Sequence, residues 1–304
     1  MMKALQYPPF LKPNDSVIMV SPSSRIDKKL VSKAKERLEA WGLKVSLAKH
    51  VVSAYDNYAG TEDDRRVDFQ EAMDNKKYKA IFCTRGGYGA VHFIDQLDFT
   101  QFKQSPKWLI GYSDITALHL RFNNEGFATL HGPMARHLAT APEGEASLLY
   151  LKGLLFGKKP TYFCPSHQLN RKGKATGVLW GGNLSVLGAM QGTPYAVIAK
   201  ETILFVEDIG EHLHAIERFF YNLKHSGVLD QLSGLIVGQF TDYLENQLLG
   251  RRVYRMLSKL LKPYSFPVCY NFPTGHTKMN YPLICGSYVQ FNVENEKITL
   301  SFIS

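Results

Sequence analysis

KWLIGYSDITALHL, residues 107–120, places an apolar strand, a tight turn and an amphipathic helix in direct succession. The run Trp108–Ile110 is short, uncharged and bounded by proline and glycine, which is typical of a buried strand. From Ile115 onward apolar residues recur at helical spacing, so a helix is predicted there. Ser113 is therefore expected on the turn, at a helix N-terminus whose N–H groups and dipole favour an oxyanion.

Ser113 has two interpretations at this position. A serine on a turn between strand and helix is the nucleophile in the elbow of many hydrolases. Ser113 or Asp114 equally suits the ordinary role of helix N-cap. The elbow pattern is also incomplete, because Ile115 stands where Gly-x-Ser-x-Gly has its second glycine. This stretch alone leaves both interpretations open.

Composition indicates a globular protein without a membrane partner. The chain of 304 residues is long enough for one large or two ordinary domains, and 45% of its residues are hydrophobic. No run of about 18 apolar residues is present, so no transmembrane helix is predicted. Residues 1–9 lack the apolar core and cleavage site of a signal peptide, so we expect a cytoplasmic protein.

Metal and nucleic-acid chemistry are not indicated. The four cysteines are widely spaced, and His212 and His214 lie two residues apart, which no metal motif uses. We expect no metal and no cofactor. The net charge of +9 favours acidic partners, but no RNA-binding or helix-turn-helix pattern accompanies the basic runs. A solvated basic surface is one interpretation and a small anionic substrate is another; no nucleic-acid partner is expected.

Strands and helices alternate through the first half of the chain. Strands are predicted at Ser16–Val20, Lys44–Leu47, Ala80–Cys83, Trp108–Ile110 and Phe127–Leu130. Helices are predicted between them, including one capped at Thr61 and one that runs from the glycine-rich turn to Leu97. This alternation predicts an α/β fold with a doubly wound parallel sheet, which binds ligands at the carboxyl ends of its strands.

Residues 158–175 are predicted as a linker between two domains. The segment is basic, polar and broken by prolines and a glycine, with few periodic apolar positions. An N-terminal α/β domain would then span residues 1–157, and a smaller mixed α/β domain would span residues 176–304. Near the end of the chain, Val289–Phe302 alternates as a hairpin.

Two side chains of the second half complete a catalytic set with Ser113. Glu207 follows the apolar run Ile203–Val206, and a carboxylate so close to a buried strand needs a partner. The alternative is a loop acid that caps the next helix. His276 lies on a turn in Pro-Thr-Gly-His-Thr, where an ordinary surface histidine would also fit. Nucleophile, acid and base in this order form one of the recurring serine triads.

Six motifs, in order along nearly the whole chain, resemble those of the murein tetrapeptide carboxypeptidases, serine peptidases also called LD-carboxypeptidases. They are Ser21–Ser23, Arg85–Ala90, Gly111–Thr116, Gly181–Leu184, Phe205–Asp208 and Phe272–His276. Each motif is weak alone, but the ordered set is specific. One departure is His92, where the family often has arginine.

The resemblance implies a triad of Ser113, Glu207 and His276, with the N–H groups of Gly86 and Asp114 as the oxyanion hole. It also implies an amidotransferase-like N-terminal domain, a smaller domain that carries acid and base, and a homodimer. The expected reaction removes the terminal D-alanine from cytoplasmic murein tetrapeptides in peptidoglycan recycling.

Substrate contacts are expected from Arg85, which is nearest to the oxyanion turn, and from Asn183. An exopeptidase must hold the free terminal carboxylate of its peptide, and a planar guanidinium suits that task.

Two alternatives remain from the sequence. The microcin immunity peptidases, a sister group, cleave an aminoacyl-nucleotide antibiotic and carry a base-stacking tryptophan after Gly-Gly-Asn-Leu. Residues 188–195 contain no tryptophan here, which favours a cell-wall peptide. The other alternative is a non-catalytic module in which Gly86–Gly89 cradles a phosphate, although neither phosphate-loop spacing is present.

Overall fold

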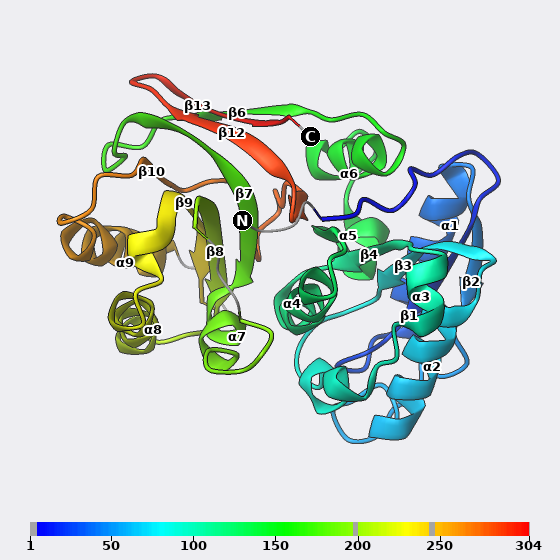
Figure 1. Cartoon of the computed structure of the whole chain (residues 1–304). Coiled ribbons are helices and arrows are strands. Elements are labelled where there is room, and N and C mark those ends of the chain that lie inside the picture. The colour runs from blue at the N-terminus through cyan, green and yellow to red at the C-terminus, as the bar shows by residue number, and fades with distance from the viewer. Residues whose placement is uncertain (1–4, 197–199, 243–246, 304) are drawn as a thin grey trace. The chain divides into compact units, whose positions relative to one another are not determined.

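The computed structural model describes residues 5–196, 200–242 and 247–303 and divides into two compact units (Figure 1). One unit is Leu5–Lys158, and the other holds Lys159–Ser304. Each unit has a sheet with its own helices, so the α/β fold class predicted from the sequence is confirmed. Within the described ranges, no helix has both the length and the apolar character needed to cross a membrane.

A doubly wound parallel sheet forms the N-terminal unit. Its strands are β1 (Ser16–Val20), β2 (Lys44–Leu47), β3 (Tyr78–Cys83), β4 (Trp108–Gly111) and β5 (Thr129–His131). They pair in the order β5-β4-β3-β1-β2, and every pair is parallel. The chain reverses its direction across the sheet after β2, so right-handed crossovers put the first helix on one face and the next helices on the other.

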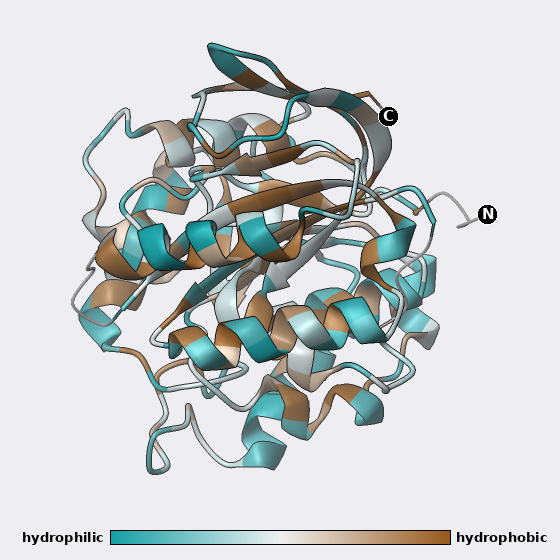
Figure 2. Ribbon diagram, turned by 90° about the vertical axis from the view of Figure 1, so that its left-hand side faces the viewer, coloured by the Kyte–Doolittle hydropathy of each residue, from teal (hydrophilic) through white to brown (hydrophobic). Residues whose placement is uncertain are grey.

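Helices and short 3₁₀ turns follow the strands of this unit. They are α1 (Lys28–Ala40), α2 (Glu62–Asp74), α3 (Thr100–Gln104), α4 (Thr116–Asn124), α5 (Ala135–Thr140) and α6 (Ala146–Leu155), with 3₁₀ turns η1 (Ala90–His92), η2 (Ile94–Gln96) and η3 (Ser113–Ile115). Thr61 and Asp64 form the predicted capping box of α2. α1 packs against α5, and α2 packs against α3. Figure 2 shows polar and apolar bands alternating along the helices.

The helix predicted to run to Leu97 is wrong. Its place is taken by η1 and η2, two single turns separated by Phe93, whose backbone has a φ of −131°. The Phe93 side chain is fully buried and packs against Phe69 with ring centroids 6.0 Å apart. Burial of this ring in the core breaks the helix, and the local pattern gives no sign of it.

A mixed sheet forms the C-terminal unit. Its strands are β6 (Thr161–Pro165), β7 (Gly173–Asn183), β8 (Thr202–Ile209), β9 (Leu232–Thr241), β10 (Val268–Tyr270), β12 (Tyr288–Val293) and β13 (Lys297–Phe302), and β11 (Leu283–Cys285) is a further short strand. The order is β10-β9-β8-β7-β12-β13-β6. The pairs from β10 to β7 are parallel and the remaining pairs are antiparallel.

Three helices cover the parallel part of this sheet. They are α7 (Leu184–Ala189), α8 (Leu213–His225) and α9 (Gln247–Leu260), with the 3₁₀ turn η4 (Leu229–Gln231) before β9. α8 packs against both α7 and α9 (Figure 1). The carboxyl ends of β8, β9 and β10 therefore lie together at one edge of the sheet, as parallel strands require.

The second half of the chain differs from prediction in one place. The segment expected to be a linker, residues 158–175, contains β6, which pairs with β13. Tyr162 and Cys164 are buried while Phe163 is exposed, so the strand alternates, but it is short and ends at a proline. The hairpin predicted over Val289–Phe302 is confirmed as β12 and β13.

Phe122 of α4 provides a test of the N-terminal core. Its ring is fully buried and meets three aromatic rings edge-on, those of Phe69, Phe99 and Phe102. We expect Phe122→Ala to lower the free energy of unfolding by about 3–5 kcal/mol, measured by urea denaturation, because it leaves a cavity. The control is Val67→Ala on the exposed side of α2, and equal effects of the two changes would contradict this packing.

Candidate active site

Ser113 occupies a strained turn directly after β4. Tyr112 is extended, and Ser113 then takes a φ of +65°, in the left-handed region that residues with a Cβ rarely adopt. η3 and α4 follow at once. Neither has a side-chain cap, so the capping interpretation of Ser113 and Asp114 is wrong. The geometry is that of a nucleophile elbow, in which backbone strain presents a serine at the edge of the sheet.

The glycine-rich turn after β3 lies directly against Ser113. A Cβ built on Gly86 would stand 2.8 Å from Ser113 Cβ and 3.2 Å from the Asp114 backbone nitrogen, so only glycine fits. In the part of the chain that the structure describes, the N–H groups of Gly86 and Asp114 donate no hydrogen bond. Two such donors beside a serine hydroxyl suit an anionic tetrahedral oxygen.

The Asp114 carboxylate ties three loops together. It is buried and accepts hydrogen bonds from Ser23 Oγ at 2.6 Å and from the Ala90 N–H at 2.9 Å. Burial raises the pKa of Asp114, and both hydrogen bonds oppose that rise. From the sequence we expect only the backbone N–H of Asp114 to have a role. The Ser-Pro-Ser motif, which contains the hydrogen-bond partner Ser23, is the sequence feature that points to a role for the Asp114 carboxylate as well.

Arg65 of α2 is a positioning residue that sequence reasoning missed. Its buried guanidinium donates to the carbonyl of Pro22 in the loop after β1 (2.9 Å) and to the carbonyl of Gly89 in the glycine-rich turn after β3 (2.7 Å). It also lies 3.1 Å from Nδ1 of His92, the one departure from the family pattern. The available signal was spacing, because Arg65 shares the buried face of α2 with Phe69.

Glu207 and His276 meet in the C-terminal unit. The Glu207 side chain on β8 is fully buried, and its Oε2 lies 2.7 Å from His276 Nδ1. Because an ionised carboxylate only accepts hydrogen bonds, Nδ1 carries the proton and Nε2 is the basic nitrogen. A Cβ on Gly275 would stand 2.9 Å from Glu207 Cβ, and the φ of Gly275 is +121°, so the close approach requires glycine.

The loop that carries His276 is fixed by Asn280, another residue that the sequence did not indicate. Its buried Oδ1 accepts from the Gly275 N–H at 3.0 Å and from Thr274 Oγ1 at 3.3 Å. The Thr274 carbonyl in turn accepts from the Gln239 N–H on β9. The imidazole is thus held by the sheet through its own loop.

Two acids act on the protonation of His276. Burial lowers the pKa of His276, but the Glu207 charge and hydrogen bond, with a further contribution from Asp208, raise it above its usual 6.5. Asp208 is itself buried beside Glu207, and burial together with that charge raises its pKa to about 7. Backbone donors at Ser185 and Ile209 hold Asp208 in place.

The two expected substrate contacts lie in different units. Asn183 is buried, caps α7 through its Oδ1 and donates to Asp208 Oδ1 at 2.9 Å, so it has a structural role. Arg85 is exposed, and its guanidinium donates to the Arg25 carbonyl at 2.6 Å. Contact of either with a substrate stays a prediction. Ser113, Gly86, Asp114 and Arg85 belong to the N-terminal unit, and the other predicted site residues belong to the C-terminal unit.

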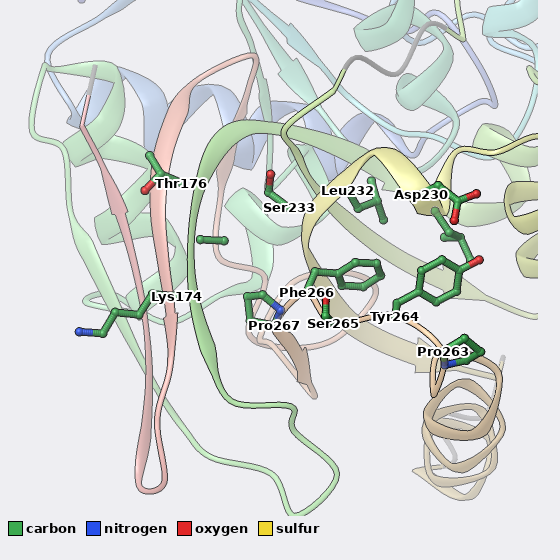
Figure 3. Close-up of a pocket in the computed structure, with 12 residues that line it drawn as sticks. Lys174, Thr176, Asp230, Leu232, Ser233, Pro263, Tyr264, Ser265, Phe266 and Pro267 are labelled. Carbon is green, nitrogen blue, oxygen red and sulfur yellow. The ribbon is translucent and has the colours of Figure 1, made fainter.

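A cavity of about 560 Å³ lies at the opposite edge of the C-terminal sheet from Glu207 (Figure 3). It is lined by the first residues of β7 and β9 and by Pro263–Pro267, just before β10. Tyr264 faces Asp230 there, and Lys174 extends away from the other labelled residues. No group of three or more potential metal-ligating side chains gathers anywhere in the described ranges.

Comparison with known proteins gives matches over both units. The family model for the LD-carboxypeptidase N-terminal domain matches residues 17–132, and the one for the C-terminal domain matches residues 176–291. A murein tetrapeptide carboxypeptidase of Pseudomonas aeruginosa is 31% identical over 87% of this chain and 89% of the relative.

Solved structures are similar over nearly the whole chain. The muramoyltetrapeptide carboxypeptidase of Oxalobacter formigenes is 28% identical with a TM-score of 0.85, and the match covers 95% of this chain and 99% of that one. MccF in complex with glutamyl sulfamoyl guanosine is 24% identical with a TM-score of 0.86, covering 99% and 100%, which shows a shared fold.

The approach of Gly86 to Ser113 can be tested with a fluorophosphonate probe, which labels activated serines. We expect Gly86→Ala to slow labelling of Ser113 by about 10²-fold or more, since a displaced turn removes an oxyanion donor. Gly153→Ala in α6 is the control, because its new Cβ would have no neighbour nearer than 3.6 Å. Equal labelling rates in two folded variants would contradict the geometry.

The raised pKa of His276 predicts its titration. Followed by NMR of the imidazole, His276 should gain its proton at a pH above 6.5 in the parent protein. Glu207→Gln removes the charge that favours the imidazolium, so the midpoint should move to lower pH, because burial then dominates. An unchanged midpoint would mean that Glu207 does not control this proton.

Proposed function

This chain belongs to the LD-carboxypeptidase family, and on that premise we propose that it is a serine carboxypeptidase that removes the terminal D-alanine from murein tetrapeptides. Its relatives are peptidases, so hydrolysis of a peptide bond is the shared chemistry. The single observation that carries the assignment is the 2.7 Å bond between buried Glu207 and His276. The strained Ser113 beside two N–H donors supports it.

In the proposed reaction, Ser113 with its two N–H donors and the Glu207–His276 pair act on the same peptide bond. Ser113 Oγ attacks the carbonyl carbon before the terminal D-alanine, and its proton passes to His276 Nε2. The N–H groups of Gly86 and Asp114 stabilise the oxyanion. The C–N bond then breaks, and D-alanine leaves with the proton from His276. Water, deprotonated by His276, releases the shortened peptide from Ser113.

Glu207 keeps the imidazole in the tautomer that this sequence needs and stabilises the imidazolium that forms twice in each turnover. Its full burial means that the charge is poorly screened by solvent and acts strongly on the neighbouring ring.

The names of the relatives favour a murein peptide as substrate. Both carboxypeptidases named above carry the tetrapeptide in their names. The antibiotic-cleaving alternative has support from shared fold alone, and residues 188–195 offer no tryptophan for a nucleobase. A cytoplasmic role in peptidoglycan recycling and a homodimer are parts of the same proposal.

The test compares three peptides under identical conditions by mass spectrometry. We expect D-alanine to be released from the free tetrapeptide, while the pentapeptide and the C-terminally amidated tetrapeptide stay almost intact, because an exopeptidase must orient the terminal carboxylate. Ser113→Ala should lower the rate by about 10⁴-fold or more. Equal cleavage of free and amidated tetrapeptide would make the protein a general serine hydrolase, and a folded Ser113→Ala variant with normal rates would exclude the nucleophile.

A further inference from the structure

A second cavity, of about 600 Å³, opens at the carboxyl edge of the C-terminal sheet. Its wall is made by the last residues of β9, by α9 and by the loop that carries His276. Its lining includes Gln239, Arg251, Tyr254, Asn271, Thr277 and Lys278. Its size lies in the range of roughly 300–1,000 Å³ that small ligands occupy, so one alanine would fill little of it.

The loop that carries the His276 imidazole forms part of the cavity wall. Pro273 and Thr277, on either side of His276 in the chain, both line it. The loop between them is anchored by the Asn280 side chain and by a hydrogen bond from the Tyr281 N–H to the Pro273 carbonyl. A ligand held in the cavity is therefore held at a fixed place relative to the general base.

The charge of the cavity is of one sign. Arg251 and Lys278 are exposed cations on two of its walls, and none of the lining residues that the structure describes is acidic. In the ranges that the structure describes, neither cation has a carboxylate within salt-bridge distance. Two cations beside one cavity, with no carboxylate to neutralise them, favour the binding of an anionic ligand.

The floor of the cavity is rigid and amphipathic. The Tyr254 side chain is buried: its hydroxyl donates to the Gly238 carbonyl at 2.9 Å, and its ring packs against the ring of Tyr270. Gln239 Nε2 donates to Asn271 Oδ1 at 2.9 Å, and Asn271 holds a left-handed φ of +65°. A peptide chain with carboxylate side chains matches this combination of amide side chains and cations better than a simple anion does.

We propose that this cavity is a specificity subsite for carboxylates on the internal residues of the peptide, on the acyl side of the cleaved bond. The inference rests on the proposed function, in which His276 acts at that bond. Arg251 and Lys278 would bind carboxylates that survive the reaction, whereas the terminal carboxylate departs with D-alanine. The subsite thereby selects acidic peptides over neutral ones.

The experiment measures binding by titration calorimetry in the Ser113→Ala background, which stops turnover. Two tetrapeptides are compared, one with free internal carboxylates and one with those carboxylates amidated, and both keep the terminal carboxylate. We expect the acidic peptide to bind roughly tenfold or more tightly, which is the usual effect of a charge-assisted hydrogen bond. Arg251→Ala combined with Lys278→Ala should remove this preference and leave the amidated peptide unaffected.

Arg255→Ala is the matched control, because it removes an exposed arginine from the same helix that does not line this cavity. It should keep the full preference. If the double variant discriminates as its parent does, the subsite is wrong, even while D-alanine release by the wild-type chain upholds the proposed function. If the wild-type chain releases no D-alanine from either peptide, the proposed function fails, and the calorimetric preference still decides whether the cavity binds carboxylates.

Discussion

A fully buried carboxylate, that of Glu207, is the constraint on which the C-terminal unit depends. An ionised acid inside a sheet needs a compensating partner, and His276 supplies it over 2.7 Å. The conformation of the loop that carries His276 follows from the need to bring the imidazole to this carboxylate. Gly275 lets the backbone approach the acid, and Asn280 holds the loop that brings the imidazole to it. The pair is therefore both a chemical unit and the reason for the conformation of the loop.

The N-terminal unit also contains a buried acid that needs polar partners, but its partners differ from those of Glu207. Asp114 is a second buried acid, but its partners are a hydroxyl and a backbone N–H, and a cation is only nearby. It fixes the loops after β1 and β3 around the turn at Ser113. Arg65 then binds one carbonyl of each of these loops, that of Pro22 after β1 and that of Gly89 after β3. The buried side chains of Asp114 and Arg65 thus fix the glycine-rich turn after β3 in place. Across the residues that the structure describes, the N–H groups of Gly86 and Asp114 remain free to donate to a ligand.

Local patterns in the sequence, such as apolar periodicity and glycine, were enough to predict the fold class, the strand-to-helix turn at Ser113 and the C-terminal hairpin. They failed where distant contacts decide. Phe93 breaks a helix by entering the core, and β6 forms in a supposed linker because β13 offers an edge. The pairing of Glu207 with His276 follows from the order of the triad, but Arg65 and Asn280 depend on loops that only the folded chain brings together. The joint action of Ser113 with that pair stays a prediction.

The left-handed backbone at Ser113 has a consequence for how this protein tolerates change. A residue with a Cβ in that conformation raises the free energy of the folded state by about 1–2 kcal/mol, and glycine would not. Under the proposed function, in which Ser113 is the nucleophile, stability and catalysis therefore make opposite demands at this position. Laboratory evolution that selects for heat resistance alone would favour glycine there and, on that proposal, yield a more stable but inactive protein. Any thermostabilised variant of this chain has to gain its stability elsewhere and keep the strained turn.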